Sequence, residues 1–176
     1  DGELLGLIGL RDPPKPESRE AVRWLKRMGI DISIVTGDNL VTARAVGQEL
    51  GITNAVADVM PWEKAEVVRR LQEEGVLVGF VGDGVNDAPA LARADVGFAL
   101  GTGTDIAAEA GHILLIRGDL RDLVASIQLS RRVMLQVKQN LAWAFLYNSI
   151  LIPLAVMGAL HPIHAGLAMA MSSITI

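Results

Sequence analysis

The stretch VLVGFVGDGVNDAPALA at residues 76–92 decides the fold. It begins with a continuous apolar run, which is typical of a buried strand in a parallel sheet. The run stops at the Gly-Asp-Gly around Asp83, and a second carboxylate follows at Asp87. Because the strands of an open α/β sheet border a crevice at their carboxyl ends, these carboxylates predict a functional site there. The alternative is a Gly- and Asp-rich turn that only reverses the chain.

Strands and helices alternate on both sides of this stretch. Apolar runs predict strands at 4–10, 32–35, 55–57, 76–81, 96–100 and 113–116. Periodic apolar positions, with Gly and Pro as boundary signals, predict five helices. They lie at 17–28, between 36–39 and residue 50, at 62–74, after the 82–87 turn and near 105–110. This alternation predicts an α/β fold with a mostly parallel sheet covered by helices on both faces.

Charge divides the chain into two regions. The 176 residues include 16 Lys and Arg and 20 Asp and Glu, all of which lie at or before Lys138. Residues 1–138 therefore have the mixed charge of a water-exposed domain, and the net charge of −4 argues against nucleic-acid binding. Since the chain has no Cys, a disulfide framework and a zinc ribbon are both excluded.

The uncharged region 139–176 predicts a transmembrane helical hairpin. A long helix should start with an acidic N-cap at Asp119 and run into 141–160, and about 20 apolar residues are enough to cross a bilayer. Basic residues before the apolar part place the start of this helix on the cytoplasmic side. A turn follows at His161, and 163–176 begins a second span. A buried hairpin of a soluble protein is the alternative.

Three segments carry groups that suit phosphate and magnesium. Thr36 and Gly37 offer a hydroxyl and an unhindered N–H at a helix start, where the helix dipole favours anions. Lys64 supplies a mobile positive charge for phosphoryl oxygens, and Asp83 and Asp87 are hard oxygen ligands for Mg²⁺. Together these groups predict phosphoryl transfer, but no nucleophile is apparent. Taken singly, the same motifs also fit a helix cap or a solvated lysine.

Four motifs of the chain resemble those of one family. They are TGDN at 36–39, PxxK at 61–64, GDGVNDAPALARADVGFAL at 82–100 and GTGTDIAAEA at 101–110. They are similar to the phosphorylation domain of P-type ATPases, which has the haloacid-dehalogenase-like (HAD-like) fold. The resemblance implies an ATP-driven cation pump that passes through an aspartyl-phosphate intermediate. It therefore implies ATP as a substrate and Mg²⁺ as a cofactor.

The resemblance also implies roles for individual residues. A catalytic set would bind the phosphoryl group, stabilise it or order the site, and it comprises Thr36, Gly37, Asp38, Lys64 and Asn86. Asp83 would ligate Mg²⁺, with Asp87 in the same metal site. Asp12 and Pro13, in the DPPK at 12–15, resemble the hinge that leads back from the nucleotide-binding domain.

The chain also departs from the family pattern. The family's phosphorylated Asp lies in an Asp-Lys-Thr-Gly-Thr string, and no such string is present, nor are the nucleotide-binding and actuator domains. We therefore expect a C-terminal piece of a longer pump that does not hydrolyse ATP on its own. Residues 1–118 would be a partial phosphorylation domain. Residues 119–176 would be a linker helix and two C-terminal transmembrane helices, the second truncated.

Polar residues within the predicted spans indicate the cargo. Met169 and Ser173 are spaced i, i+4, so a thioether and a hydroxyl share one helix face. A thioether favours Cu(I), and no charged residue is present there to suit a divalent cation. This region resembles the copper(I)-exporting branch of heavy-metal P-type ATPases, which implies that the transport ligands are Tyr147, Asn148, Met169 and Ser173. Packing between helices is the alternative role for these side chains.

Other hypotheses stay open beside the copper(I) pump. A zinc, cadmium or cobalt pump should carry charges in its spans, and Ag(I) could replace Cu(I) as cargo. A membrane-tethered HAD-like phosphatase should carry its own Asp-x-Asp nucleophile in the first strand. A non-catalytic membrane-anchored module should not respond to Mg²⁺.

The copper(I) pump hypothesis also implies a location and partners. It implies a multi-pass protein of the cell (inner) membrane with residues 1–138 in the cytoplasm. Its partners would be the rest of the pump, membrane lipid and a copper chaperone, but not nucleic acid.

Overall fold

The computed structural model describes residues 13–83, 85–101, 109–158 and 166. Contacts divide the chain into two compact units, residues 1–125 and residues 126–176. The first unit holds all the described strands. The predicted strand at 4–10 and all but one residue of the predicted second span lie outside the described part of the chain.

Helices and strands alternate as predicted, with small shifts at their ends. The helices are α1 (Pro16–Arg27), α2 (Leu40–Leu50), α3 (Pro61–Glu73), the 3₁₀ helix η1 (Val85–Asp87), α4 (Ala88–Arg93) and α6 (Leu120–Val156). The strands are β1 (Ser33–Val35), β2 (Asn54–Val56), β3 (Gly79–Gly82), β4 (Val96–Leu100) and β5 (Ile113–Leu115). Of the helix predicted near 105–110, only residues 109 and 110 are described.

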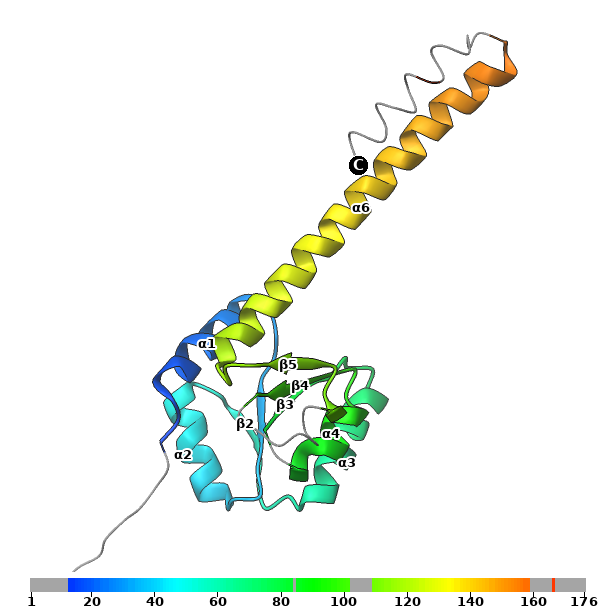
Figure 1. Cartoon of the computed structure of the whole chain (residues 1–176). Helices are drawn as coiled ribbons and strands as arrows, with labels where there is room; N and C mark the ends of the chain where they lie inside the picture. The colour runs from blue at the N-terminus through cyan, green and yellow to red at the C-terminus, as the bar shows by residue number, and fades with distance from the viewer. Residues whose placement is uncertain (1–12, 84, 102–108, 159–165, 167–176) are drawn as a thin grey trace, which may run out of the picture. The chain divides into compact units, whose positions relative to one another are not determined.

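Every strand pair in the described residues is parallel. β1 pairs with β2 in one sheet, and β3, β4 and β5 form a second sheet in that order (Figure 1). Helix α2 connects the first pair and α4 connects β3 to β4, as parallel pairing requires a crossover. The parallel α/β arrangement is confirmed, but the single sheet predicted from the sequence is divided in two among these residues.

Helices α3 and α4 form the core on the three-stranded sheet. Val68 of α3 packs with Ala90 of α4, and Phe80 of β3 packs against this cluster. Figure 1 shows the two helices next to each other beside the strands. A Cβ at Gly97 would lie 2.3 Å from the carbonyl oxygen of Leu91, so α4 lies directly on β4. This close packing fixes the turn that joins β3 to α4.

The strand predicted at 76–81 is shorter than expected. Strand β3 begins only at Gly79, and Val76 is 48 % exposed. Gly75 has φ +82° and the Val76 N–H donates to the Leu71 carbonyl at 3.1 Å, which is the hydrogen bond of a Schellman helix end. The first apolar residues of the run therefore close α3 instead of pairing in the sheet.

Helix α6 starts as predicted and passes through its proline. Asp119 caps the start, because its Oδ1 accepts the Arg121 backbone N–H at 2.8 Å. The helix continues past Pro153 and ends at Val156, before the end of the predicted span at 141–160. Within the described ranges, no helix combines the length and the apolar content that crossing a membrane requires. The predicted transmembrane hairpin is therefore not confirmed.

Candidate functional site

The loop after β1 places Thr36, Gly37 and Asp38 directly before a helix. Asn39 is the N-cap of α2, and its Oδ1 accepts the Thr42 N–H at 2.9 Å. The Thr36 Oγ1 accepts the Asp38 N–H at 3.1 Å, so the hydroxyl hydrogen of Thr36 is available to an external acceptor. This local geometry is compatible with an anion at the start of α2, and the predicted anion site stays a prediction.

A second loop holds the first one in place. Thr36 donates its N–H to the Val56 carbonyl at 3.0 Å and accepts the Val59 N–H at 3.1 Å. The Asp58 N–H donates to the Asp38 carbonyl at 2.8 Å. Asp58 has a φ of +56°, an uncommon conformation for a residue other than Gly. Residues 36–38 are therefore fixed against the segment that opens α3.

Helix α3 follows that segment and carries Lys64 near its start. The Glu63 Oε2 accepts the Met60 N–H at 2.8 Å, which caps the helix start. The Lys64 Nζ lies 2.6 Å from the Asp87 Oδ1, and the two side chains are only 16 % and 13 % exposed. In this structure the Lys64 ammonium, which the sequence analysis describes as a mobile charge, is held by a partly buried, charge-assisted hydrogen bond.

Asp87 reaches Lys64 by folding back over the end of β3. It ends η1 and is the N-cap of α4, but its side chain makes no capping hydrogen bond. A Cβ at Gly82 would lie 2.6 Å from both the Cβ and the Oδ2 of Asp87. Gly82 is therefore a site residue that the sequence pattern does not distinguish from its neighbours. The only signal is a small residue directly before Asp83.

Asp83 and Asp87 differ in how available they are to a cation. Asp83 is exposed just after β3 and makes no polar side-chain contact with the other described residues, and Asn86 is also exposed. The Asp87 carboxylate already faces the Lys64 ammonium. Mg²⁺ takes one or two carboxylates together with water and phosphate oxygens, so Asp83 fits as a ligand. The described residues contain no group of three His, Cys, Asp or Glu side chains that could form an all-protein metal site.

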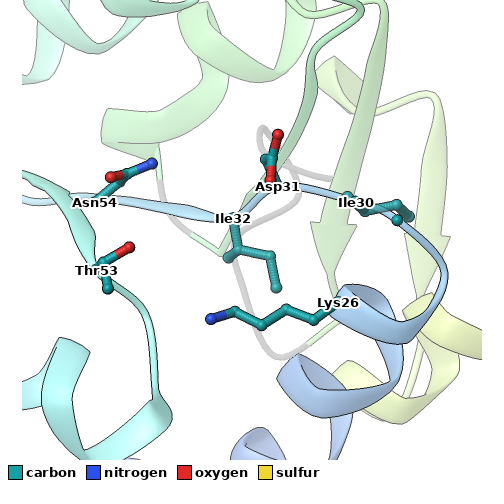
Figure 2. Close-up of a pocket in the computed structure, with 7 residues that line it drawn as sticks. Lys26, Ile30, Asp31, Ile32, Thr53 and Asn54 are labelled. Carbon is teal, nitrogen blue, oxygen red and sulfur yellow. The ribbon is translucent and has the colours of Figure 1, made fainter.

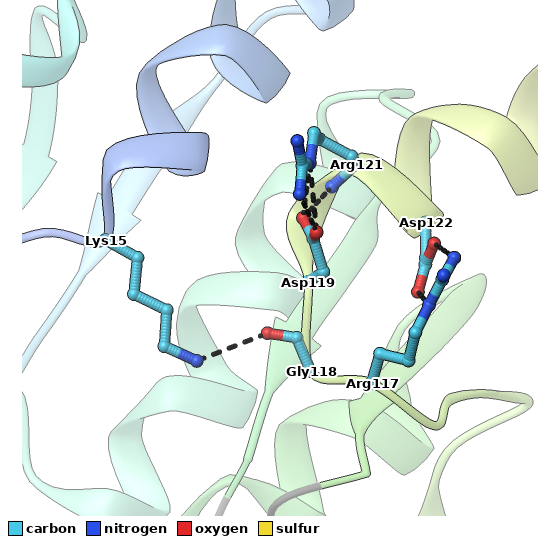
Figure 3. Close-up of polar contacts among 6 residues, drawn as sticks. All are labelled: Lys15, Arg117, Gly118, Asp119, Arg121 and Asp122. Atoms are coloured by element: carbon cyan, nitrogen blue, oxygen red, sulfur yellow. Dashed lines mark hydrogen bonds and ion pairs between the residues drawn. The ribbon is translucent and has the colours of Figure 1, made fainter.

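The predicted hinge is described only in part. Asp12 lies outside the described residues, and Pro13 is exposed. Lys15, two residues further on, donates from its Nζ to the Gly118 carbonyl at 3.4 Å (Figure 3). The start of α1 thus contacts the turn between β5 and α6.

Two ion pairs frame that turn. Arg117 pairs with Asp122 at 2.5 Å, and Asp119 pairs with Arg121 at 2.7 Å (Figure 3). The hydrogen bond from Arg121 lowers the pKa of the Asp119 carboxyl, and the Asp122 carboxylate raises the pKa of Arg117. Because the arginines are exposed to water, these pairs define the turn geometry and add little stability.

A cavity of about 320 Å³ lies where the chain enters β1 and β2. Figure 2 shows its lining residues, which are Lys26, Gly29, Ile30, Asp31, Ile32, Thr53 and Asn54. The Lys26 ammonium also donates to the Gly51 carbonyl at the end of α2. Of the predicted site residues that the structure describes, none lines this cavity. The Thr36 loop, for example, follows the opposite end of β1.

The predicted transport residues are only partly described. Met169 and Ser173 lie outside the described residues. Tyr147 and Asn148 are consecutive in α6, so their side chains leave the helix about 100° apart. The Tyr147 ring faces the ring of Trp143, with centroids 6.2 Å apart and planes tilted by 34°. Asn148 lines a groove on a different face.

Comparison with known sequences identifies relatives of the whole chain. A model of the haloacid dehalogenase-like hydrolases matches residues 1–95. A copper-exporting P-type ATPase of Bacillus subtilis (strain 168) is 52 % identical over 176 residues, which is 100 % of this chain and 22 % of that protein. A probable copper-exporting P-type ATPase of Archaeoglobus fulgidus is 51 % identical over 184 residues, again 100 % of this chain and 23 % of that protein. The chain therefore spans less than a quarter of these relatives.

Solved structures of related proteins have the same fold. A zinc-transporting PIB-type ATPase in its E2.Pi state superposes with a TM-score of 0.87 at 32 % identity, covering 94 % of this chain and 27 % of that one. The catalytic domain of the CPx-ATPase CopB-B gives a TM-score of 0.60 at 35 % identity, covering 65 % of this chain and 45 % of that one.

Proposed function

Because this chain belongs to the haloacid dehalogenase-like hydrolase family, we propose that it is the C-terminal part of a copper(I)-exporting P-type ATPase. The observation that carries the proposal is the Lys64–Asp87 ion pair, which joins the start of α3 to the turn after β3. Backbone hydrogen bonds tie the segment before α3 to the Thr36 loop. Three motifs that are far apart in sequence are therefore linked by direct contacts.

These linked motifs suit a phosphorylated aspartate. Thr36 and Gly37 would receive the phosphoryl oxygens at the start of α2, and Lys64 would stabilise their charge. Asp87 would hold the Lys64 ammonium in place, while Asp38 and Asn86 would order the surrounding groups. Asp83 would hold Mg²⁺, which supplies charge neutralisation at the phosphoryl group when bound.

The nucleophile would come from another segment of the pump. Its carboxylate would attack the γ-phosphorus of ATP, ADP would leave, and water would later hydrolyse the acyl phosphate. Among the described strands, β1 and β3 each pair on one side only, and an open strand edge can accept a further strand. A parallel strand on either edge would end beside Thr36 or Asp83. Asp12 and Pro13 would lie in the hinge to the nucleotide-binding domain.

The cargo and the location belong to the same proposal. Tyr147, Asn148, Met169 and Ser173 would bind Cu(I) in a multi-pass protein of the cell membrane, with residues 1–138 in the cytoplasm. Membrane lipid, the remaining domains of the pump and a copper chaperone would be the partners. The curated relatives named as copper exporters support this cargo, whereas the zinc-transporting structural relative makes a divalent-cation pump the second candidate.

The test is metal-stimulated ATP hydrolysis by the full-length protein in detergent or liposomes. Cu(I) should stimulate hydrolysis, and Zn²⁺ or Cd²⁺ should not. Asp83→Asn should reduce turnover by about 100-fold or more, because it removes a charged Mg²⁺ ligand. Asp31→Asn is the matched control, since Asp31 is an exposed carboxylate that lines the other cavity, and it should retain activity.

Each failure has a distinct meaning. Stimulation by Zn²⁺ alone would favour the second candidate. Hydrolysis of small phosphate esters without any response to metal cargo would favour a phosphatase. Equal activity of Asp83→Asn and Asp31→Asn would remove Asp83 from the magnesium site.

A further inference from the structure

Helix α1 has a basic exposed side in a chain that is acidic overall. The whole sequence has 20 acidic and 16 basic residues, whereas α1 has four basic residues and two acidic ones. The buried side of the helix includes Ala21, Val22 and Leu25. The exposed positions from the first turn onward are mostly basic, and they are Arg19, Glu20, Arg23, Trp24, Lys26 and Arg27. Positive charge is therefore concentrated on the outer side of this helix.

The two acidic residues of α1 lie close to the start of α6. The hydrogen bond to Asp119 raises the pKa of the Arg121 guanidinium, and the charges of Glu17 and Glu20 raise it further. Both carboxylates are therefore near enough to act on a cation of another helix. They form no ion pair with the arginines of their own helix among the described residues.

Three arginines of α1 have no charged partner within the described ranges. Arg19, Arg23 and Arg27 follow one another at i, i+4 spacing, so they share one face. Both arginines of α3, in contrast, pair with glutamates of their own helix. The Arg27 guanidinium lies over the Trp24 ring, 5.1 Å from its centroid, and Trp24 is 42 % exposed. Tryptophan and arginine are the residue types that most often anchor protein interfaces.

We propose that this α1 face, which comprises Arg19, Arg23, Trp24 and Arg27, docks an acidic segment of the same full-length protein that lies outside these 176 residues. The inference rests on the proposed function, because it takes the chain to be part of a longer pump. Charge complementarity defines the chemistry of the partner, since guanidinium groups bind carboxylates in bidentate pairs. A nucleic acid is disfavoured by the net charge of −4.

The weakness of exposed charge contacts favours a tethered segment over a separate protein. Exposed ion pairs are screened by water and salt, and each contributes little, so three arginines and one tryptophan hold a free partner only weakly. A tethered segment reaches an effective concentration in the millimolar range, where weak contacts are sufficient. The chain covers only 22 % of its Bacillus subtilis relative, so a pump of similar length has ample further chain to supply this segment.

Photo-cross-linking in the full-length protein tests the proposal. The photoreactive amino acid p-benzoylphenylalanine, introduced by nonsense suppression, replaces the exposed Trp24. The irradiated protein is then digested and analysed by mass spectrometry. We expect position 24 to be linked to a segment of the same molecule that lies outside these residues and is rich in Asp and Glu. A mixture of isotope-labelled and unlabelled protein distinguishes links within one molecule from links between two.

Charge variants test whether the arginines hold that segment. Arg23→Glu/Arg27→Glu should lower the yield of the cross-link about fivefold, whereas Arg23→Lys/Arg27→Lys should keep at least about half of it. Arg44→Glu is the matched control and should leave the yield unchanged, because Arg44 is an exposed arginine on α2. Salt at about 1 M, which shortens the Debye length to about 3 Å, should also lower the yield, and this arm needs no variant that could misfold.

Each contrary result has its own meaning. A cross-link only to lipid, only to a second copy or only to a segment without acidic residues would overturn the inference, and so would the absence of any cross-link. Equal yields in Arg23→Glu/Arg27→Glu and Arg44→Glu would show that charge does not hold the segment. Because cross-linking does not depend on transport, a wild-type protein that keeps the cross-link but shows no Cu(I)-stimulated hydrolysis would overturn the proposed function alone.

Discussion

Helix α3 carries two kinds of ion pair that share their chemistry and differ in their surroundings. Lys64 reaches out of the helix to Asp87 at 2.6 Å, and both side chains are less than a fifth exposed. Arg69 stays on its own helix, where it pairs with Glu66 at 2.6 Å and also with Glu73, with side chains 37–58 % exposed. The Lys64–Asp87 pair joins α3 to η1, whereas the Arg69 pairs lie within α3 alone.

This comparison shows that the candidate site is distinguished by an ion pair that is mostly buried and joins two elements, not by the number of ion pairs. Exposed pairs are screened by water and salt, and most add little stability. A mostly buried pair is different, because removing one partner leaves the other charge uncompensated. Lys64 and Asp87 should therefore be sensitive to substitution, and the Arg69 set should not.

The largest effect should come from breaking the buried pair. Lys64→Met keeps most of the side-chain volume but leaves the Asp87 carboxylate without its partner. We expect the free energy of unfolding to fall by about 2 kcal/mol, somewhat less than for a fully buried pair. Urea denaturation followed by tryptophan fluorescence measures this loss. The double variant Lys64→Met/Asp87→Leu should recover part of it, and an unchanged midpoint in Lys64→Met would contradict the distinction.

A smaller loss of stability should follow when the Asp87 carboxylate is displaced from Lys64 by a substitution that changes no charge. Gly82→Ala places a Cβ 2.6 Å from the Asp87 Oδ2, so the carboxylate must move away from Lys64. We expect a loss of about 1–2 kcal/mol by the same measurement, as for other forced contacts. Gly79→Ala is the control, because its Cβ would meet other atoms only at 3.5 Å and beyond. Gly75→Ala is unsuitable, because the positive φ of Gly75 would strain any other residue. Equal losses in the two variants would contradict the mechanism.

The smallest effect should appear in acid, on the exposed set. The hydrogen bond from Arg69 lowers the pKa of Glu66 from 4.5 to about 2. Because the pKa of Glu66 is lower in the folded state, its ionised carboxylate stabilises the fold above about pH 4.5. This contribution to the free energy of unfolding is lost as the pH falls toward 2. Arg69→Ala should therefore reduce the pH dependence of the unfolding free energy in this range, with less effect near neutral pH than Lys64→Met. An identical acid profile in Arg69→Ala would contradict the assignment.

The sequence predicted most elements because their signals are local. Apolar periodicity and the glycine stops locate the helices, and the left-handed Gly51 confirms one such stop. The N-cap of α6 at Asp119 was also predicted from the sequence, and the structure confirms it. The start of β3 was not, because Val76 is apolar yet belongs to the end of α3, and hydrophobicity alone cannot separate these roles.

The candidate site was predictable in its residue types but not in its contacts. The motifs indicated Lys64 and Asp87 separately, while their ion pair joins residues 23 positions apart and depends on how α3 meets η1. The need for Gly82 likewise follows from where the Asp87 side chain lies.

The phosphorylated intermediate tests the central claim most directly. The full-length protein is incubated with Mg²⁺, Cu(I) and ATP labelled at the γ-phosphate, quenched in acid and digested. We predict an acid-stable, hydroxylamine-sensitive label on an aspartate outside these 176 residues. No label, or a label on an aspartate within this chain such as Asp83, would contradict the conclusion that these loops receive a phosphoryl group carried by another segment.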